Sequence, residues 1–94
     1  MRLVWTPQAL DDRDAISAYI AAGNPRAAAK MDALFDAQAE KLLTNPQIGP
    51  PSVALGTREL IPHKSYRLIY TVDDETISIL TIISTARQWP PAQS

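Results

Sequence analysis

The sequence predicts an α+β fold in the order β-α-α-β-β-β, with a helical hairpin packed on a mainly antiparallel four-stranded sheet. The first half of the chain carries apolar residues at helical spacing, whereas the second half alternates apolar and polar residues like strands. A stretch punctuated by proline and glycine, residues 46–56, separates the two halves. Helices and strands segregated in this way favour an α+β architecture over an alternating α/β one.

The N-terminal region predicts a short strand followed by a helix. Residues 2–5 alternate polar and apolar side chains, and Thr6-Pro7 then supplies an N-cap and a first-turn proline. A helix of about 14 residues follows and stops at Gly23. Its apolar stripe consists of Ala9, Ile16, Tyr19 and Ile20.

A second, longer helix is the most clearly marked element. Asn24-Pro25 repeats the cap-then-proline start, and Asn45-Pro46 ends the helix after about 20 residues. Because the connection between the helices is so short, they must be antiparallel neighbours, with Phe35 and Leu42 buried together. The apolar stripe comprises Ala27, Ala28, Met31, Leu34, Phe35, Leu42 and Leu43.

Three strands, Thr57–Ile61, Tyr66–Val72 and Glu75–Ser84, are predicted for the second half. The turns between them are Pro-His-Lys-Ser and Asp73-Asp74, and such short turns predict an antiparallel meander. The last strand carries apolar residues on both faces, so it is expected to be central, with the first strand of the chain beside it. Strict alternation places Ile77, Ile79 and Ile83 on one face and Leu80 and Ile82 on the other.

Composition narrows the function classes. A chain of 94 residues predicts one domain, residues 1–94, and the absence of cysteine excludes disulfides and thiolate chemistry. The N-terminus lacks a signal-peptide pattern and no apolar run could span a membrane, so we expect a cytoplasmic protein without a membrane partner. A net charge of −1 argues against diffuse attraction to nucleic acid.

Motifs for metal or nucleotide chemistry are missing. The sequence has no HExxH, no glycine-rich phosphate loop and no nucleophile elbow, so we expect no metal and no cofactor. Asp11, Asp12 and Asp14 form an acidic cluster on an early helical turn. The helix dipole and solvation explain these carboxylates better than a metal site does.

The candidate site residues are mostly basic: Arg58, His63, Lys64, Arg67 and Arg87. Arg58 and Arg67 could face one another on adjacent strands and clamp a phosphate, or they could only solvate the sheet or pair with Glu59. His63 could act as a general base, although a single turn histidine is more often incidental, and the same holds for Lys64. Trp89 could contact a partner or close the edge of the core.

Several segments resemble the RelE/ParE toxins. They are Trp-Thr-Pro-Gln-Ala at residues 5–9, Tyr-Ile-Ala-Ala-Gly-Asn-Pro-Arg-Ala-Ala at 19–28, Asn-Pro-Gln-Ile-Gly at 45–49, Gly-Thr-Arg-Glu-Leu at 56–60, Tyr-Arg-Leu-Ile-Tyr at 66–70 and Ala-Arg-Gln-Trp at 86–89. Together they cover nearly the whole chain. The resemblance implies the toxin of a type II toxin-antitoxin system, neutralised by a cognate antitoxin protein.

The resembled family includes ribosome-dependent messenger RNA endoribonucleases (RelE-like) and poisons of DNA gyrase (ParE-like). For a ribonuclease, the resemblance matches Arg67 and Arg87 and a basic residue at Arg58, and His63 and Lys64 remain as the candidates for the base. Leu60 and Gln93, however, stand where those enzymes carry proton-transferring residues, and neither can move a proton. The resemblance therefore favours gyrase poisoning, with Arg87 and Trp89 as target-binding residues. The alternatives are the ribosome with mRNA as target, or an inactive homologue that only binds antitoxin.

Overall fold

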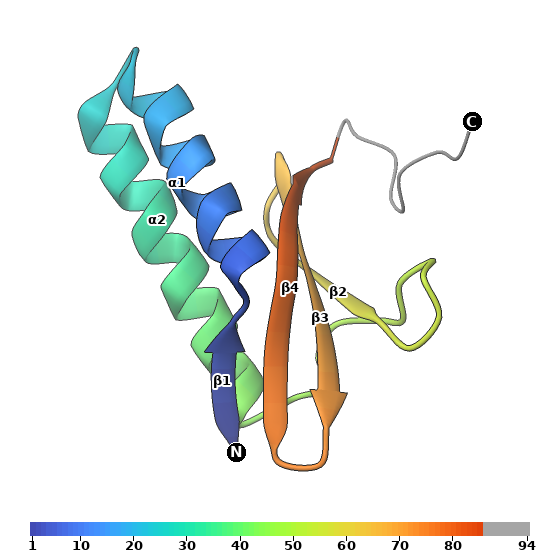
Figure 1. The fold of residues 1–94 in the computed structure, drawn as a ribbon. Coiled ribbons are helices and arrows are strands. Elements are labelled where there is room, and N and C mark those ends of the chain that lie inside the picture. The colour runs from blue at the N-terminus through green and yellow to red at the C-terminus, as the bar shows by residue number, and fades with distance from the viewer. Residues whose placement is uncertain (86–94) are drawn as a thin grey trace.

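The computed structural model describes residues 1–85 and has the predicted element order. The four strands form one sheet in the order β1-β4-β3-β2, where β1 is parallel to β4 and the other neighbours are antiparallel (Figure 1). The predicted central position of the last strand is confirmed. The elements are β1 (Arg2–Trp5), α1 (Pro7–Ala21), α2 (Pro25–Glu40), the 3-10 helix η1 (Lys41–Leu43), β2 (Arg58–His63), β3 (Tyr66–Asp73) and β4 (Thr76–Ser84).

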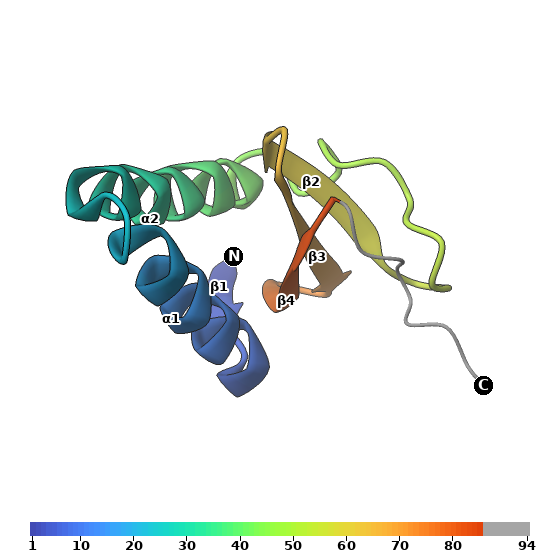
Figure 2. The same cartoon turned by 90° about the horizontal axis from the view of Figure 1, so that it is seen from above.

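Both helices begin where the sequence predicts. The Thr6 side chain accepts a hydrogen bond from the Ala9 N–H, and the Asn24 side chain accepts one from the Ala27 N–H. Each cap is followed by a proline in the first turn, whose missing N–H is not needed there. The helices form an antiparallel hairpin on one side of the sheet (Figure 2). Neither helix is long and apolar enough to cross a membrane, as far as residues 1–85 are concerned.

Arg13 joins the two helices through ion pairs. Its guanidinium lies 2.8 Å from the carboxylates of both Asp32 and Asp36 and 4.5 Å from the centre of the Trp5 ring. The Arg13 side chain is only 12% exposed, so its aliphatic part is buried while its charge is paired. One residue of α1 therefore ties that helix to α2 and to the end of β1.

The core lies between the helical hairpin and the inner face of β3 and β4. Phe35 and Leu42 are buried together there, as predicted. The prediction for Tyr19 was wrong, because this side chain is 81% exposed. It lies at the margin of the α1 stripe and lines a groove instead of the core. The core cluster comprises Ala9, Phe35, Ala39, Leu42, Leu68, Tyr70, Ile77, Ile79 and Ile82.

A bulge in β4 changes which of its side chains face the core. Tyr70 lies opposite Ile79, whereas Ile69 lies opposite Thr81, so Leu80 is an extra residue on β4. An extra residue reverses the alternation beyond it. Ile82 consequently joins Ile77 and Ile79 in the core, and the prediction that placed Ile83 there was wrong.

β2 is longer than predicted, because it runs through Pro62 to His63, and the turn contains only Lys64 and Ser65. Proline is tolerated here since β2 is an edge strand, where one side of the backbone needs no ladder hydrogen bond. The pairing is irregular at this point: His63 lies opposite Tyr66, but Leu60 lies opposite Leu68. The register therefore shifts by one residue around Pro62.

Candidate functional site

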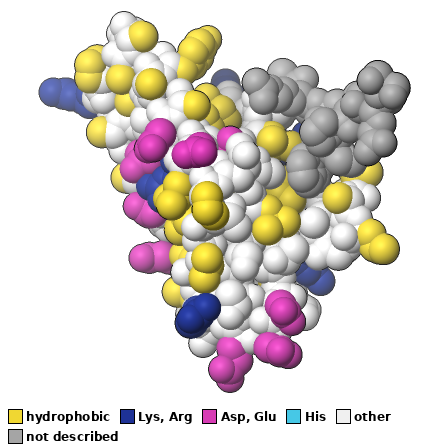
Figure 3. Space-filling view, viewed as in Figure 1, with side chains coloured by type: hydrophobic (Ala, Val, Ile, Leu, Met, Phe, Trp, Pro, Cys, Tyr) yellow, Lys and Arg dark blue, Asp and Glu magenta, His cyan; other side chains and the backbone are white. Residues whose placement is uncertain are grey.

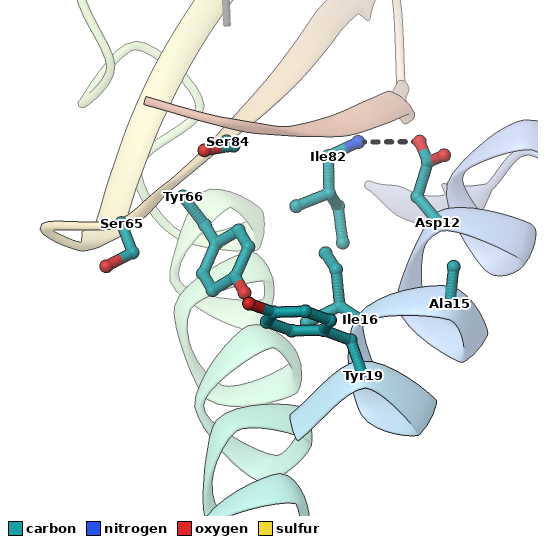
Figure 4. Close-up of a pocket in the computed structure, with 8 residues that line it drawn as sticks. All are labelled: Asp12, Ala15, Ile16, Tyr19, Ser65, Tyr66, Ile82 and Ser84. Carbon is teal, nitrogen blue, oxygen red and sulfur yellow. Dashed lines mark hydrogen bonds between the residues drawn. The ribbon is translucent and has the colours of Figure 1, made fainter. Parts of the chain in front are cut away.

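A groove of about 570 Å³ lies between α1 and the C-terminal half of β4 (Figure 4). The apolar side chains of Ile16 and Ile82 line it, and Tyr19 and Tyr66 point toward one another across it. Ser65 and Ser84 add hydroxyl groups at the strand ends. A cleft with apolar walls and a few polar groups is typical of a binding site. The lining residues are Asp12, Ala15, Ile16, Tyr19, Ser65, Tyr66, Ile82 and Ser84.

Side chains of the α1 region replace a strand neighbour along this part of β4. The pairing of β1 with β4 ends at Trp5 and Ile79. Beyond it, the Thr6 hydroxyl donates to the carbonyl oxygens of Ile79 and Leu80, both at 2.9 Å. The Asp12 carboxylate then accepts hydrogen bonds from the Thr81 hydroxyl at 2.5 Å and from the Ile82 N–H at 2.9 Å. Together these bonds anchor α1 to the sheet, and the bonded Asp12 and Ile82 line the groove.

The interpretation of Asp12 as a solvated, dipole-stabilising residue was therefore wrong. Asp12 is partly buried and bonded to β4, whereas Asp11 and Asp14 are exposed. The three carboxylates do not converge on one point, and no group of potential metal ligands occurs within residues 1–85.

Removing the Asp12 carboxylate is expected to destabilise the fold. We expect Asp12→Ala to lower the free energy of unfolding by about 1–3 kcal/mol, because the buried Ile82 N–H loses its acceptor. Asp11→Ala makes the same change of charge on an exposed residue and should alter stability by less than about 0.5 kcal/mol. Urea denaturation followed by circular dichroism measures both. Equal losses for the two variants would contradict a specific role for Asp12.

The predicted phosphate clamp does not form, because Arg58 and Arg67 lie on opposite faces of the sheet. Arg58 lies opposite Tyr70 on the core face and donates to the Gly49 carbonyl oxygen at 2.7 Å. Arg67 lies on the other face, 3.7 Å from the Glu59 carboxylate, so the alternative of pairing with Glu59 is confirmed. The register shift around Pro62 separates the two arginines, since a one-residue slip moves a side chain to the other face.

The two candidate bases, both predicted to lie in the turn, are placed differently: His63 is the last residue of β2, and only Lys64 lies in the turn. The Nδ1 atom of His63 accepts a hydrogen bond from the Ser65 N–H at 3.1 Å, which leaves the proton of neutral His63 on Nε2. The imidazole lone pair that a general base needs is thus already occupied. Lys64 is exposed in the turn. Arg87, Trp89 and Gln93 lie outside the described residues.

Arg58 instead belongs to a polar joint, the hydrogen-bonded group of Gly49, Arg58 and Tyr70, which holds the loop between η1 and β2. The Tyr70 hydroxyl accepts from the Gly49 N–H at 3.0 Å and donates to the Pro46 carbonyl oxygen at 2.9 Å. Burial raises the pKa of Tyr70, and the Gly49 hydrogen bond and the Arg58 charge oppose that rise. Gly49 has no room for a side chain, because a Cβ atom there would lie 2.8 Å from the Tyr70 hydroxyl oxygen and would clash with the Glu59 carbonyl oxygen.

Residues 3–89 match the family model of the ParE toxin of type II toxin-antitoxin systems, parDE. This chain belongs to the ParE toxin family. The resemblance to RelE/ParE toxins and the preference for the ParE branch are thereby confirmed. The groove, the β4 edge contacts and the Tyr70 joint are accordingly features of a ParE-family toxin.

Three individual proteins are similar to this chain in sequence or in fold. Y4kP of Sinorhizobium fredii, which is named as a candidate toxin, is 34% identical over 90 residues, covering 95% of this chain and 93% of Y4kP. A chain of the chromosomal ParDE system from P. aeruginosa superposes with a TM-score of 0.78 at 31% identity, covering 89% of this chain and 95% of that one. A chain of the YoeB-YefM complex from Staphylococcus aureus shares the fold, with a TM-score of 0.61 at 23% identity over 86% and 92% of the two chains.

Proposed function

We propose that this ParE-family toxin arrests growth by poisoning DNA gyrase and that a cognate antitoxin neutralises it. The observation that favours gyrase over RNA cleavage is the scatter of the basic side chains. Arg58 is bound to the Gly49 carbonyl, Arg67 is paired on the opposite face, and the lone pair of His63 is occupied. Within residues 1–85 these groups offer no joint site for a phosphate and a proton, which RNA cleavage requires.

The surface charge is consistent with a protein target. On the face shown in Figure 3, acidic side chains gather along the left flank and at the lower end, the basic side chains are few and separate, and no basic stripe is visible. Binding to the RNA backbone depends on such clustered cations. The target contacts that we propose near the C-terminus are Arg87 and Trp89, because arginine and tryptophan are common anchors of protein interfaces.

For the antitoxin we propose the groove between α1 and β4 as docking site. Its apolar walls, Ile16 and Ile82, are flanked by the Tyr19 and Tyr66 hydroxyls, so a peptide could bury side chains and still pair its polar groups. A disordered antitoxin tail that folds on binding would suit such a groove. The solved ParDE system and the YoeB-YefM complex support an antitoxin protein as the partner.

Purified toxin tests the target. We expect it to inhibit gyrase supercoiling or trap cleaved DNA while ribosome-bound mRNA stays intact, because losing general acid-base catalysis lowers a rate about 10²–10⁴-fold. Arg87→Ala and Trp89→Ala should weaken gyrase inhibition, whereas His63→Ala should have little effect. Codon-positioned mRNA cuts that vanish with His63→Ala, on fully active gyrase, would instead establish the ribonuclease.

Growth measurements test neutralisation. Expression of the toxin alone should arrest growth, and co-expression with the antitoxin encoded beside it should restore growth. Normal growth despite folded toxin would favour the third hypothesis, an inactive homologue that only binds antitoxin.

A further inference from the structure

The groove between α1 and β4 has chemically distinct parts. Its middle is apolar, with Ile16 on one side and Ile82 on the other. At one end the hydroxyl groups of Tyr19 on α1 and Tyr66 on β3 point toward each other (Figure 4). Asp12 lies at the other end and is bonded to Ile82. A segment bound along the groove would therefore meet an apolar middle, a hydroxyl end and an acidic end.

The carboxylate at the acidic end is already engaged by the toxin itself. One Asp12 carboxylate oxygen accepts from the Gln8 side-chain amide at 2.8 Å, and the other accepts from the Thr81 hydroxyl and the Ile82 N–H. Of the described residues that line the groove, Asp12 is the only acidic one and none is basic. A positively charged side chain of a partner would therefore lose its hydration without gaining a free carboxylate.

The hydroxyl end, in contrast, offers hydrogen-bond donors. Within residues 1–85, no hydrogen bond engages the hydroxyl groups of Tyr19, Ser65 or Tyr66. A hydroxyl group can donate to a carboxylate, and such charge-assisted bonds are about twice as strong as bonds between neutral groups. Because Tyr19 and Tyr66 converge from different elements, one carboxylate can accept from both. This end of the groove thus favours an acidic side chain of a partner over a basic one.

We propose that the antitoxin segment bound in the groove places an apolar side chain between Ile16 and Ile82 and an aspartate or glutamate carboxylate between the hydroxyl groups of Tyr19 and Tyr66. This inference rests on the proposed function, and it adds the chemistry that the toxin recognises. It also gives a role to Tyr19, a large aromatic side chain that is 81% exposed on α1. A lysine or arginine at the same place would be rejected, because no free carboxylate among the described lining residues pairs with it.

The toxin side of the contact is tested by removing hydroxyl groups alone. We expect Tyr19→Phe/Tyr66→Phe to raise the dissociation constant for the purified antitoxin encoded beside the toxin by about tenfold or more, the loss typical of hydrogen bonds to a charged group. The single variant Tyr19→Phe, on an exposed side chain, should show part of this loss. Ser17→Ala is the control, because it deletes a hydroxyl group from α1 outside the groove. All variants keep the contact of the residue-66 ring with Phe35, so their melting temperatures should match the wild type.

The antitoxin side is tested by a double-mutant cycle. Each aspartate and glutamate of the antitoxin is changed in turn to asparagine or glutamine, and calorimetry measures its binding to wild-type toxin and to Tyr19→Phe/Tyr66→Phe. We expect one of these changes to weaken binding to the wild type by about tenfold. The same change should alter binding to the double variant by less than about twofold, because the carboxylate has then already lost its donors.

The outcomes separate this inference from the proposed function. Wild-type toxin that does not bind the antitoxin would refute neutralisation by this partner, and the inference would fall with it. Tight binding by the wild type and equal binding by Tyr19→Phe/Tyr66→Phe would overturn the inference alone. So would equal losses for the double variant and Ser17→Ala, or a cycle in which no aspartate or glutamate of the antitoxin couples to the two tyrosines.

Discussion

Phe35→Ala is expected to lower the free energy of unfolding by about 3–5 kcal/mol. Phe35 is 1% exposed at the centre of the core, and its ring meets the Tyr66 ring edge to face, with centroids 5.7 Å apart. The substitution removes the ring contact of α2 with Tyr66 at the start of β3 and leaves a cavity. Since small domains are stable by only about 5–15 kcal/mol, much of that stability would be lost.

Chemical denaturation followed by circular dichroism measures the loss for Phe35→Ala. Lys30→Ala provides the control, because Lys30 is exposed on the same helix and alanine preserves helix propensity. A loss below about 1 kcal/mol for Phe35→Ala would contradict the packing described here.

Gly49→Ala is expected to cost about 1–3 kcal/mol and to loosen the loop before β2. The new methyl group would collide with the Glu59 backbone and the Tyr70 hydroxyl, so the loop must move and both hydrogen bonds of Tyr70 weaken. Gly23→Ala is a matched control, because the nearest atom to its Cβ would be 4.0 Å away. Denaturation midpoints report the stability, and hydrogen exchange at residues 49–59 reports the loop. Equal stability and exchange for the two variants would refute the role of the joint.

The element order could be predicted because its signals are local. Thr6-Pro7 and Asn24-Pro25 carry both cap and first-turn residue within the sequence itself, and the structure places the helix starts there. The inward face of β4 could not be predicted in the same way. Leu80 becomes an extra residue only through the register that β3 imposes, and no local pattern around it marks a bulge.

The predicted phosphate clamp of Arg58 and Arg67 was wrong for a related reason, the register of a strand pair. Without the irregularity around Pro62, continuing the pairing of His63 with Tyr66 would place Arg58 on the same face as Arg67, as the clamp required. The shift by one residue reverses that relation. The Asp12 contact with β4 was missed because its partners, Thr81 and Ile82, lie at the other end of the described chain. Pro62 within a strand was the one local signal that could have indicated a bulge.

The parallel pairing of β1 with β4 has a consequence for how the chain acquires its structure. Arg2 lies opposite Thr76, so nearly the whole described chain separates these partners, whereas α1 and α2 are adjacent. Local contacts form first, and distant ones must wait for a long loop to close. During synthesis from the N-terminus the helical hairpin can therefore form early, but β1 stays unpaired until β4 has been made. The sheet is therefore completed only after β4 has been synthesised.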